Sequence, residues 1–371
     1  MNLTWLEISK NALLNNILEI KKRIPKKTKF IAVVKSNAYG HGLLEVVKAV
    51  VKNVDYFAVY SFDDALLLRA KKITKPILML GRVFPAQLAL AIKNNIELSV
   101  SNLDILKAAQ KFSGNKKISI HLCVDTGLGR DGFIFSDSKK ILQLLAHKNI
   151  EVKGLYTHFA APDDSAFDAY TKKQVAELLK WKNELAKIDI HPLIHASSTA
   201  GTFISDFECC FDAVRIGGGI YGLWSSQEVF DLHEKETNLL PVLAWKAVIV
   251  ELKELPKGAH ISYGCTFTLQ RDSKIAILPV GYFDGIPRIS SKKGEVIVNG
   301  IKVLQLGRVT MNMIVVDVTD VKKIKVGDIA TIIGSEKKQV VSAEDWGDWS
   351  GSFNYEITTR INPNLIRKLV S

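Results

Sequence analysis

Residues 33–42 read VVKSNAYGHG, and their lysine, Lys35, stands directly after an apolar run. Lys35 closes the predicted strand 30–35, at the carboxyl end where barrel enzymes carry their catalytic groups. Burial of an ammonium group is costly, so the pKa of such a lysine falls and its amine becomes a nucleophile that can form a Schiff base. The alternative is a lysine that simply reaches solvent beyond the strand.

A second chemically suggestive segment is VRIGGGIYG at residues 214–222. Consecutive glycines let backbone N–H groups approach a phosphate closely. The loops after the seventh and eighth strands of a barrel are also where phosphate is usually bound. The segment therefore indicates a phosphate site, although glycines of this kind also form plain turns.

The elements that must position these residues alternate between strands and helices. The predicted strands are 30–35, 56–61, 77–81, 97–100, 118–124, 152–158, 193–197 and 213–217. They are short and almost continuously apolar, as strands buried on both faces of a parallel sheet are. Helical periodicity follows Ser9 and recurs at 43–51, 63–71, 86–94, 103–112, 137–147 and 168–187. This pattern predicts an α/β fold with an N-terminal (β/α)8 TIM-like barrel, and a doubly wound sheet is the alternative.

The character of the sequence changes after about residue 240. Apolar runs at 247–252, 274–280, 295–298, 313–318 and 328–333 are separated by Gly, Pro and Asn turns. This pattern predicts a mostly β second domain. We expect a barrel domain at 10–235 and a β-rich domain at 236–371, which residues 1–9 would join.

Composition excludes several classes of protein. No apolar run approaches the ~20 residues of a membrane helix, and the N-terminus lacks the pattern of a signal peptide. The four cysteines form no CxxC pair, which argues against a metal site and suits the cytoplasm. The net charge of +12 leaves nucleic-acid binding open, but much of the excess lies in lysine pairs typical of a surface.

The segment VVKSNAYGHG resembles the lysine motif of the alanine racemase family, which depends on pyridoxal 5'-phosphate (PLP) and has fold-type III. Other segments resemble that family's motifs in the same order along nearly the whole chain. They are VDTGLGRDGF (124–133), YTHFA (156–160), HASSTA (195–200), VRIGGGIYG (214–222), ISYG (261–264), PVGYFDGIPR (279–288), GRVTMNMIVVD (307–317) and FNYEI (353–357). One such motif is weak, but this ordered set is specific.

The resemblance implies that Lys35 holds PLP covalently as an imine. It assigns further cofactor contacts to Tyr39, His158, Thr199, Arg215, Gly217, Gly218 and Tyr355. Arg215 would face the pyridine nitrogen and, because an arginine does not readily release a proton, would leave that nitrogen unprotonated. His158 would link the catalytic tyrosine to Arg215, and the hydroxyls and glycines would bind the phosphate.

The resemblance also implies a two-base reaction in a homodimer. Lys35 would deprotonate D-alanine, and Tyr263 would deprotonate L-alanine from the opposite face of Cα. Arg130, Met311 and Tyr282 would contact the substrate. In the family, Tyr263 and Met311 reach the barrel of the partner subunit, so the active site would lie at the subunit interface.

Two positions depart from the family pattern. Cys123 stands where several relatives carry a carbamylated lysine that orients the arginine corresponding to Arg130, and a thiol cannot form a carbamate. Asn312 stands where aspartate is usual, beside the expected carboxylate-binding residue Met311. The first departure requires another way to position Arg130, and the second leaves the breadth of substrates open.

The expected function is therefore the interconversion of L- and D-alanine, which supplies D-alanine for peptidoglycan in the cytoplasm. One alternative is a racemase of broad specificity that acts on serine as well as alanine. Another is a non-catalytic PLP-binding protein, although that group normally lacks a second domain. A fold-related decarboxylase is disfavoured because its CDGxD-type motif is absent, and nucleic-acid binding has only the charge in its favour.

Overall fold

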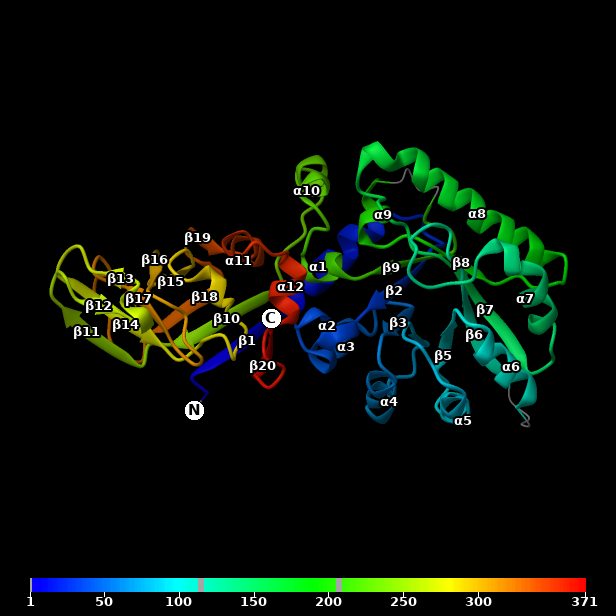
Figure 1. Cartoon of the computed structure of the whole chain (residues 1–371), viewed down its shortest axis with the longest axis horizontal. Coiled ribbons are helices and arrows are strands. Elements are labelled where there is room, and N and C mark those ends of the chain that lie inside the picture. Colours follow the sequence, from blue (N-terminus) through cyan, green and yellow to red (C-terminus); the bar gives the residue numbers. More distant parts are fainter. Residues whose placement is uncertain (1, 113–116, 205–208) are drawn as a thin grey trace. The chain divides into compact units, whose positions relative to one another are not determined.

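The computed structural model describes residues 2–112, 117–204 and 209–371 (Figure 1). The chain forms two compact units. The barrel unit contains residues 14–36 and 47–240, and the sheet unit contains the residues up to 13, residues 37–46 and residues 241–371. The sheet unit thus takes in a short segment from the first part of the chain. The boundaries 10–235 and 236–371 stay a prediction.

The barrel unit is built around a closed barrel of parallel strands. They are β2 (Lys29–Val33), β3 (Tyr56–Val59), β4 (Ile77–Met79), β5 (Glu97–Val100), β6 (Ile118–Cys123), β7 (Ile150–Tyr156), β8 (Leu193–His195) and β9 (Ala213–Ile216). The first of these strands pairs with the last through Ile31 and Arg215, which closes the ring. This closure confirms the expected (β/α)8 barrel and excludes the doubly wound sheet.

Helices precede, connect and follow the barrel strands. The α-helices are α1 (Lys10–Lys22), α2 (Lys35–Tyr39), α3 (Leu43–Val50), α4 (Phe62–Ala70), α5 (Leu88–Lys93), α6 (Leu103–Lys111), α7 (Ser138–Leu145), α8 (Asp168–Ala186), α9 (Thr199–Ile204) and α10 (Gln227–His233). At the start of α4, Ser61 is an ordinary N-cap: its Oγ accepts a hydrogen bond from Asp64 N at 3.0 Å. Among the described residues, no helix is long and apolar enough to cross a membrane.

The sheet unit contains one large, mostly antiparallel sheet. Its order is β11 (Glu251–Leu255), β14 (Ser273–Leu278), β17 (Ile314–Asp317), β16 (Ile301–Leu306), β15 (Glu295–Val298), β18 (Ile329–Glu336), β10 (Leu243–Val248), β1 (Thr4–Ser9) and β20 (Arg367–Val370), with β19 (Gln339–Val341) paired to β18. The N-terminal strand β1, blue in Figure 1, lies beside β10 with Leu6 opposite Trp245. The mostly β second domain is therefore confirmed.

Two helices in the sheet unit were not predicted. They are α11 (Ala343–Ser350) and α12 (Asn354–Thr359). The start of α11 is a capping box in which Ser342 Oγ accepts from Asp345 N at 3.0 Å and Asp345 Oδ2 accepts from Ser342 N at 2.7 Å. This serine and aspartate pair is a signal of a helix start that hydrophobic periodicity alone does not register.

Candidate functional site

Lys35 lies where the strand β2 ends, within the barrel unit. Its side chain is half-buried, and the lowered pKa of its ammonium group has burial as the main cause, with the charges of Arg130 and Arg215 adding to it. A lysine that reached solvent beyond the strand would keep its ordinary pKa. Lys35 thus has the burial and the lowered pKa that a nucleophilic amine requires, and its catalytic role stays a prediction.

The residues after Lys35 form a left-handed turn. Four consecutive residues of α2, Ser36 to Tyr39, have φ values of 53–54°. For residues with side chains this conformation costs roughly 1–2 kcal/mol each, so the surrounding structure must enforce it. Within the sheet unit, Asn37 enforces it by accepting hydrogen bonds from Leu43 N at 2.8 Å and, through its carbonyl, from Gly42 N at 2.9 Å.

Thr199 and the glycine segment converge in the barrel unit. Thr199 Oγ1 accepts hydrogen bonds from Gly217 N at 3.3 Å and from Gly219 N at 3.2 Å. A Cβ atom at Gly219 would lie only 2.9 Å from Thr199 Cγ2, so this close approach requires glycine. Sequence reasoning selected Gly217 and Gly218 and missed Gly219, whose signal was the third glycine of the same run. Gly218, which begins the 3-10 helix η4 (Gly218–Tyr221), stays a predicted donor.

Arg215, on β9, is buried and almost fully hydrogen-bonded. Its Nη1 donates to His195 Nδ1 at 2.8 Å, and its Nη2 donates to the carbonyl oxygens of Thr157 at 2.7 Å and Ala196 at 2.8 Å. Within the part of the chain that the structure describes, no group accepts a hydrogen bond from Arg215 Nε. The guanidinium is thus fixed by its two ends, and one N–H remains for a ligand.

His158 and Arg130 flank this group. Arg215 Nη2 lies 3.2 Å from His158 Nδ1, and burial together with the Arg215 charge lowers the pKa of His158 to about 3. His158 is therefore neutral at physiological pH.

Arg130 is exposed, and it follows a turn in which Asp125 Oδ1 accepts from the backbone of Gly127 and Leu128, both at 2.9 Å. This turn carries Arg130 beyond the end of β6.

Cys123, the departure at the end of β6, is buried. Its Sγ donates to the carbonyl oxygen of Asp131 at 3.8 Å, and burial raises the pKa of the thiol to about 12. A neutral thiol carries no charge that could orient Arg130. Instead, Arg130 Nε donates to Asp131 Oδ1 at 3.1 Å. The carboxylate of Asp131 is therefore the anion that this chain places on Arg130.

The remaining predicted residues belong to the sheet unit and form two groups. Tyr39 meets Tyr355 edge to face, with ring centroids 5.4 Å apart, and burial raises the pKa of Tyr39 to about 12. In the second group, Tyr282 N donates to Thr310 O at 3.0 Å, next to Met311. The side chains of Tyr282 and Met311 are exposed.

Tyr263 lies in the neighbouring turn and is 72% exposed. The preceding residue, Ser262, donates from Oγ to Arg308 O at 2.7 Å, which ties this turn to the segment that leads to Met311. Tyr263, Tyr282 and Met311 thus belong to one surface of the sheet unit.

Two sequence profiles match consecutive parts of this chain. The alanine racemase N-terminal domain matches residues 8–225, and the alanine racemase C-terminal domain matches residues 242–369. The chain belongs to the alanine racemase family. The curated alanine racemase of Methanococcus maripaludis is 38% identical over 98% of this chain and 97% of the relative. The alanine racemase of Halothermothrix orenii is also 38% identical, over 98% of this chain and 96% of the relative.

Solved structures of alanine racemases share the fold over the full length. The alanine racemase from Bacillus anthracis with bound L-Ala-P has a TM-score of 0.93 at 33% identity, covering 100% of this chain and 96% of that one. The Clostridium difficile alanine racemase in complex with cycloserine has a TM-score of 0.89 at 30% identity, covering 100% of this chain and 98% of that one. These likenesses confirm the family that the sequence motifs predicted.

The alanine racemase family depends on PLP, and the donor set in the barrel unit suits that group. The pKa of Lys35 is lowered, so more of its amine is unprotonated, which is the form that reacts with an aldehyde. Thr199 Oγ1 accepts from two glycine N–H groups, so its own hydroxyl proton is directed away from them and can be donated to a phosphate. The Nε–H of Arg215 suits an unprotonated ring nitrogen. The residues present therefore fit the cofactor.

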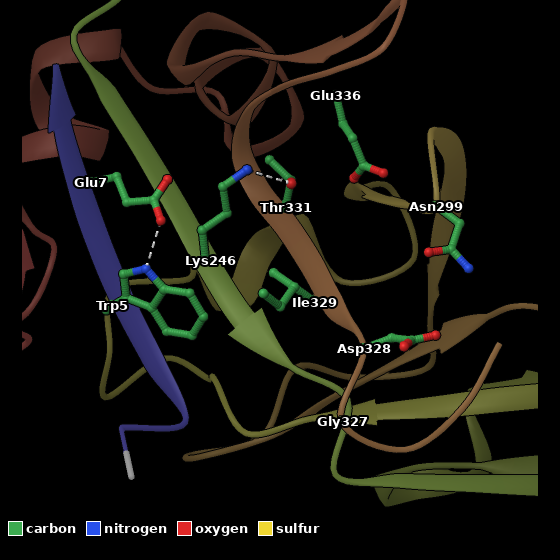
Figure 2. A pocket seen from close by; sticks show the side chains of 9 residues that line it. All are labelled: Trp5, Glu7, Lys246, Asn299, Gly327, Asp328, Ile329, Thr331 and Glu336. Carbon is green, nitrogen blue, oxygen red and sulfur yellow. Dashed lines mark hydrogen bonds between the residues drawn. The ribbon is translucent and has the colours of Figure 1, made fainter. Parts of the chain in front are cut away.

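A separate hollow of about 430 Å³ lies on the sheet unit (Figure 2). It is lined by Trp5, Glu7, Lys246, Asn299, Gly327, Asp328, Ile329, Thr331 and Glu336. Lys246 Nζ donates to Thr331 Oγ1 at 2.8 Å, and Trp5 Nε1 donates to Glu7 Oε1 at 3.0 Å. None of the residues expected to act in an alanine racemase lines this hollow.

Proposed function

We propose that this chain interconverts L- and D-alanine with PLP held covalently on Lys35. The observation that carries the proposal is the joint placement of Lys35, the Thr199 cluster and Arg215 in one barrel, in a chain that belongs to the alanine racemase family. When bound, PLP supplies an electron sink that makes the Cα proton of the amino acid acidic. The chain's own residues then bind, orient and move protons.

The chemistry of each side chain determines which part of the cofactor or substrate we assign to it. Thr199, Gly217 and Gly218 bind the phosphate, together with Tyr39 and Tyr355. Arg215 donates to the ring nitrogen without giving up a proton, because its guanidinium stays charged. A nitrogen that remains unprotonated makes the cofactor a weaker sink, which favours return of the proton to Cα over side reactions. Arg130 holds oxygens of the cofactor and substrate with its charged fork.

Two bases act from opposite faces of Cα. Lys35 takes the proton from D-alanine, and Tyr263 takes it from L-alanine. The proposed neighbour of the Tyr263 hydroxyl is His158 of the partner subunit, which links it to the charge of Arg215. Met311 offers its backbone N–H to the substrate carboxylate, and Tyr282 lines the site.

A homodimer completes the site in this proposal. Tyr263, Tyr282, Phe283, Met311 and Met313 are exposed on connected loops of the sheet unit, with Phe283 N donating to Met311 O at 3.0 Å. Large apolar side chains gathered in this way mark an interaction surface. We assign that surface to the barrel of a second copy, which brings Tyr263 to the partner's cofactor. Sedimentation of the wild type and of a Tyr282→Glu/Met311→Glu variant tests the assignment, and an unchanged dimer in the variant contradicts it.

The central proposal is tested with purified protein and PLP. We expect an absorbance band of a protein-bound imine, conversion of either alanine enantiomer to the racemate, and attachment of the reduced cofactor to the peptide that contains Lys35 after borohydride treatment. Lys35→Ala should lose the labelled peptide and the activity. A labelled peptide elsewhere in the chain would contradict the assignment of Lys35.

A racemase of broader specificity is the second candidate. Asn312 is exposed beside Met311 and replaces a negatively charged residue of the family motif. Removal of that charge changes the polarity near the substrate, which favours acceptance of serine. Racemisation rates over a panel of amino acids decide between the two, because a strict alanine racemase converts serine far more slowly than alanine.

The proposed location is the cytoplasm. Among the described residues, Cys123, which is buried, and Cys265, which is exposed, are free thiols. Free cysteines persist in a reducing compartment.

A further inference from the structure

His121 occupies a place inside the barrel that the chain has shaped for it. The pairing register of β6 with β7 shifts between Ile120 and His121. As a result, His121 lies opposite Gly154 and not opposite Lys153. A Cβ atom at Gly154 would lie 2.1 Å from His121 Nδ1. Both the bulge and the missing side chain therefore make room for the ring, which is fully buried.

The ring of His121 joins a carboxylate to the arginine of the proposed site. His121 Nε2 lies 2.7 Å from Glu97 Oε2, and His121 Nδ1 lies 2.8 Å from His195 Nε2. His195 Nδ1 in turn lies 2.8 Å from Arg215 Nη1. Glu97 begins the strand β5, at the end of the barrel opposite the carboxyl ends where Lys35 lies. A continuous chain of hydrogen bonds thus runs through the barrel.

The two ends of this chain fix its direction. Arg215 can only donate, so His195 Nδ1 must accept and the His195 proton must lie on Nε2. His195 then donates to His121 Nδ1, which places the His121 proton on Nε2, where the ionised Glu97 accepts it. One arrangement of protons satisfies every link. The neutral state of His195 agrees with burial and the Arg215 charge, which hold its pKa well below the ordinary value.

The chain does not serve to conduct protons to the cofactor. A proton wire must be able to reverse all its hydrogen bonds, and reversal here would require Arg215 to accept one. Tyr156 restrains the arrangement further, because its ring stacks on His195 at 4.9 Å and its hydroxyl lies 2.5 Å from Ser99 Oγ. The network therefore holds groups in place.

We propose that Glu97 is a positioning residue for Arg215, acting through His121 and His195. While Glu97 accepts the hydrogen bond from His121 Nε2, both histidines keep their protons on Nε2, and His195 presents the lone pair of Nδ1 to Arg215. Without that acceptor, the same arrangement leaves the Nε2–H of His121 buried and unpaired. The reversed arrangement, with both protons on Nδ1, then becomes competitive, although it turns an N–H of His195 toward Arg215 and displaces the guanidinium. The importance of Arg215 for catalysis rests on the proposed function, but the proton arrangement does not.

The first test reads the protons directly and needs neither PLP nor activity. The protein has eight histidines, which are labelled with ¹⁵N and assigned by single substitutions. In the wild type, ¹⁵N–¹H correlation spectra should show His121 and His195 both protonated on Nε2. A wild-type spectrum with either proton on Nδ1 overturns the proposal without the need for any variant.

Variants of Glu97 then distinguish its role as a hydrogen-bond acceptor from its contribution to packing. Glu97→Ala should change the tautomers of both histidines, whereas Glu97→Gln should retain them because the amide oxygen can accept the same hydrogen bond. In the loaded enzyme, Glu97→Ala should lower kcat by about tenfold or more, with KM for alanine changed less than about threefold, and Glu97→Gln should restore most of kcat.

Glu151 provides a matched control. It lies near the start of β7, which β6 separates from β5, and there Oε2 accepts from Ser119 Oγ at 3.1 Å and Oε1 pairs with Lys153 Nζ at 2.7 Å. Glu151→Ala should leave both tautomers and kcat unchanged. Equal effects of the Glu97→Ala and Glu151→Ala variants, or unchanged tautomers in Glu97→Ala, overturn the proposal. Absence of racemase activity in the wild type would overturn only the proposed function, since the spectra are recorded without it.

Discussion

Arg215 Nη2 lies 3.2 Å from His158 Nδ1 in the barrel. Nη2 also donates to the carbonyl oxygens of Thr157 and Ala196, so its two protons are shared among three acceptors. Because an arginine can only donate, His158 Nδ1 is one of these acceptors, which leaves the proton of His158 on Nε2. The lowered pKa of His158, about 3, means that this neutral form persists throughout the physiological pH range. The pair therefore presents a donor backed by a fixed positive charge, and the proposed recipient is the phenolic oxygen of Tyr263 of the partner subunit.

Tyr263→Phe should abolish racemisation but spare one half of the exchange reaction. Removal of a general base costs about 10²–10⁴-fold in rate. Lys35 remains, so D-alanine incubated in D₂O should still exchange its Cα proton with retention of configuration, while L-alanine should not. Proton NMR of both enantiomers measures the two rates.

Tyr60→Phe is the control for this experiment, since Tyr60 is also exposed, at 61%, but belongs to the barrel unit and has no proposed role. It should leave both exchange rates unchanged. Equal exchange of D- and L-alanine by the Tyr263→Phe variant would refute the two-base scheme.

Arg130→Gln should shift the pH dependence of imine formation at Lys35 to higher pH. The Arg130 charge contributes to the lowered pKa of Lys35, and only the unprotonated amine attacks an aldehyde. Loss of that charge raises the pKa, so at neutral pH a smaller fraction of the amine is reactive. Stopped-flow absorbance after mixing with PLP gives the rate at each pH. Arg82→Gln, at another exposed arginine of the barrel unit, should follow the wild-type profile.

Thr199→Val should weaken PLP binding, because the hydroxyl is lost while the side chain keeps its shape. A buried acceptor left without its donor, here a phosphate oxygen, costs about 1–3 kcal/mol, which corresponds to roughly 5–150-fold in the dissociation constant. Thr199→Ser retains the hydroxyl and should bind PLP within a few-fold of the wild type. Equilibrium titration by fluorescence measures both, and equal affinity of the valine and serine variants would contradict the phosphate role.

The free energy of unfolding should fall as the pH is lowered from 7 to 4. Burial lowers the pKa of His41 from 6.5 to about 4, so between these values the unfolded state binds a proton that the folded state does not. Such a shift corresponds to about 3 kcal/mol in total for this one group. Urea unfolding at several pH values measures the slope.

His41→Asn should flatten that slope. The amide can replace the hydrogen bond from His41 Nδ1 to the Tyr39 carbonyl oxygen at 2.9 Å but does not titrate. The exposed His191 is the matched control, and His191→Asn should leave the slope as it is in the wild type. An unchanged slope in His41→Asn would show that His41 titrates alike in both states.

Much of the fold and of the site could be predicted because these features are local in the sequence. Each barrel strand is a short apolar run, and each predicted barrel residue lies in a segment at or after the end of such a run. The sheet unit was less predictable in detail: α11 and α12 carry too few apolar residues to show a periodicity, although Ser342 and Asp345 mark where the first begins.

The sequence by itself determined that a lysine follows the strand β2, that glycines follow β9 and that parallel strands form a barrel, since such features follow from residue types and periodicity alone. Only the tertiary structure decided which polar groups meet. The left-handed turn after Lys35, the pairing of Thr199 with Gly219 and the chain from Glu97 to Arg215 all depend on backbone torsions, a β-bulge and contacts between residues far apart in the chain. Such contacts leave no periodicity, because each is set by the packing of a folded barrel around it.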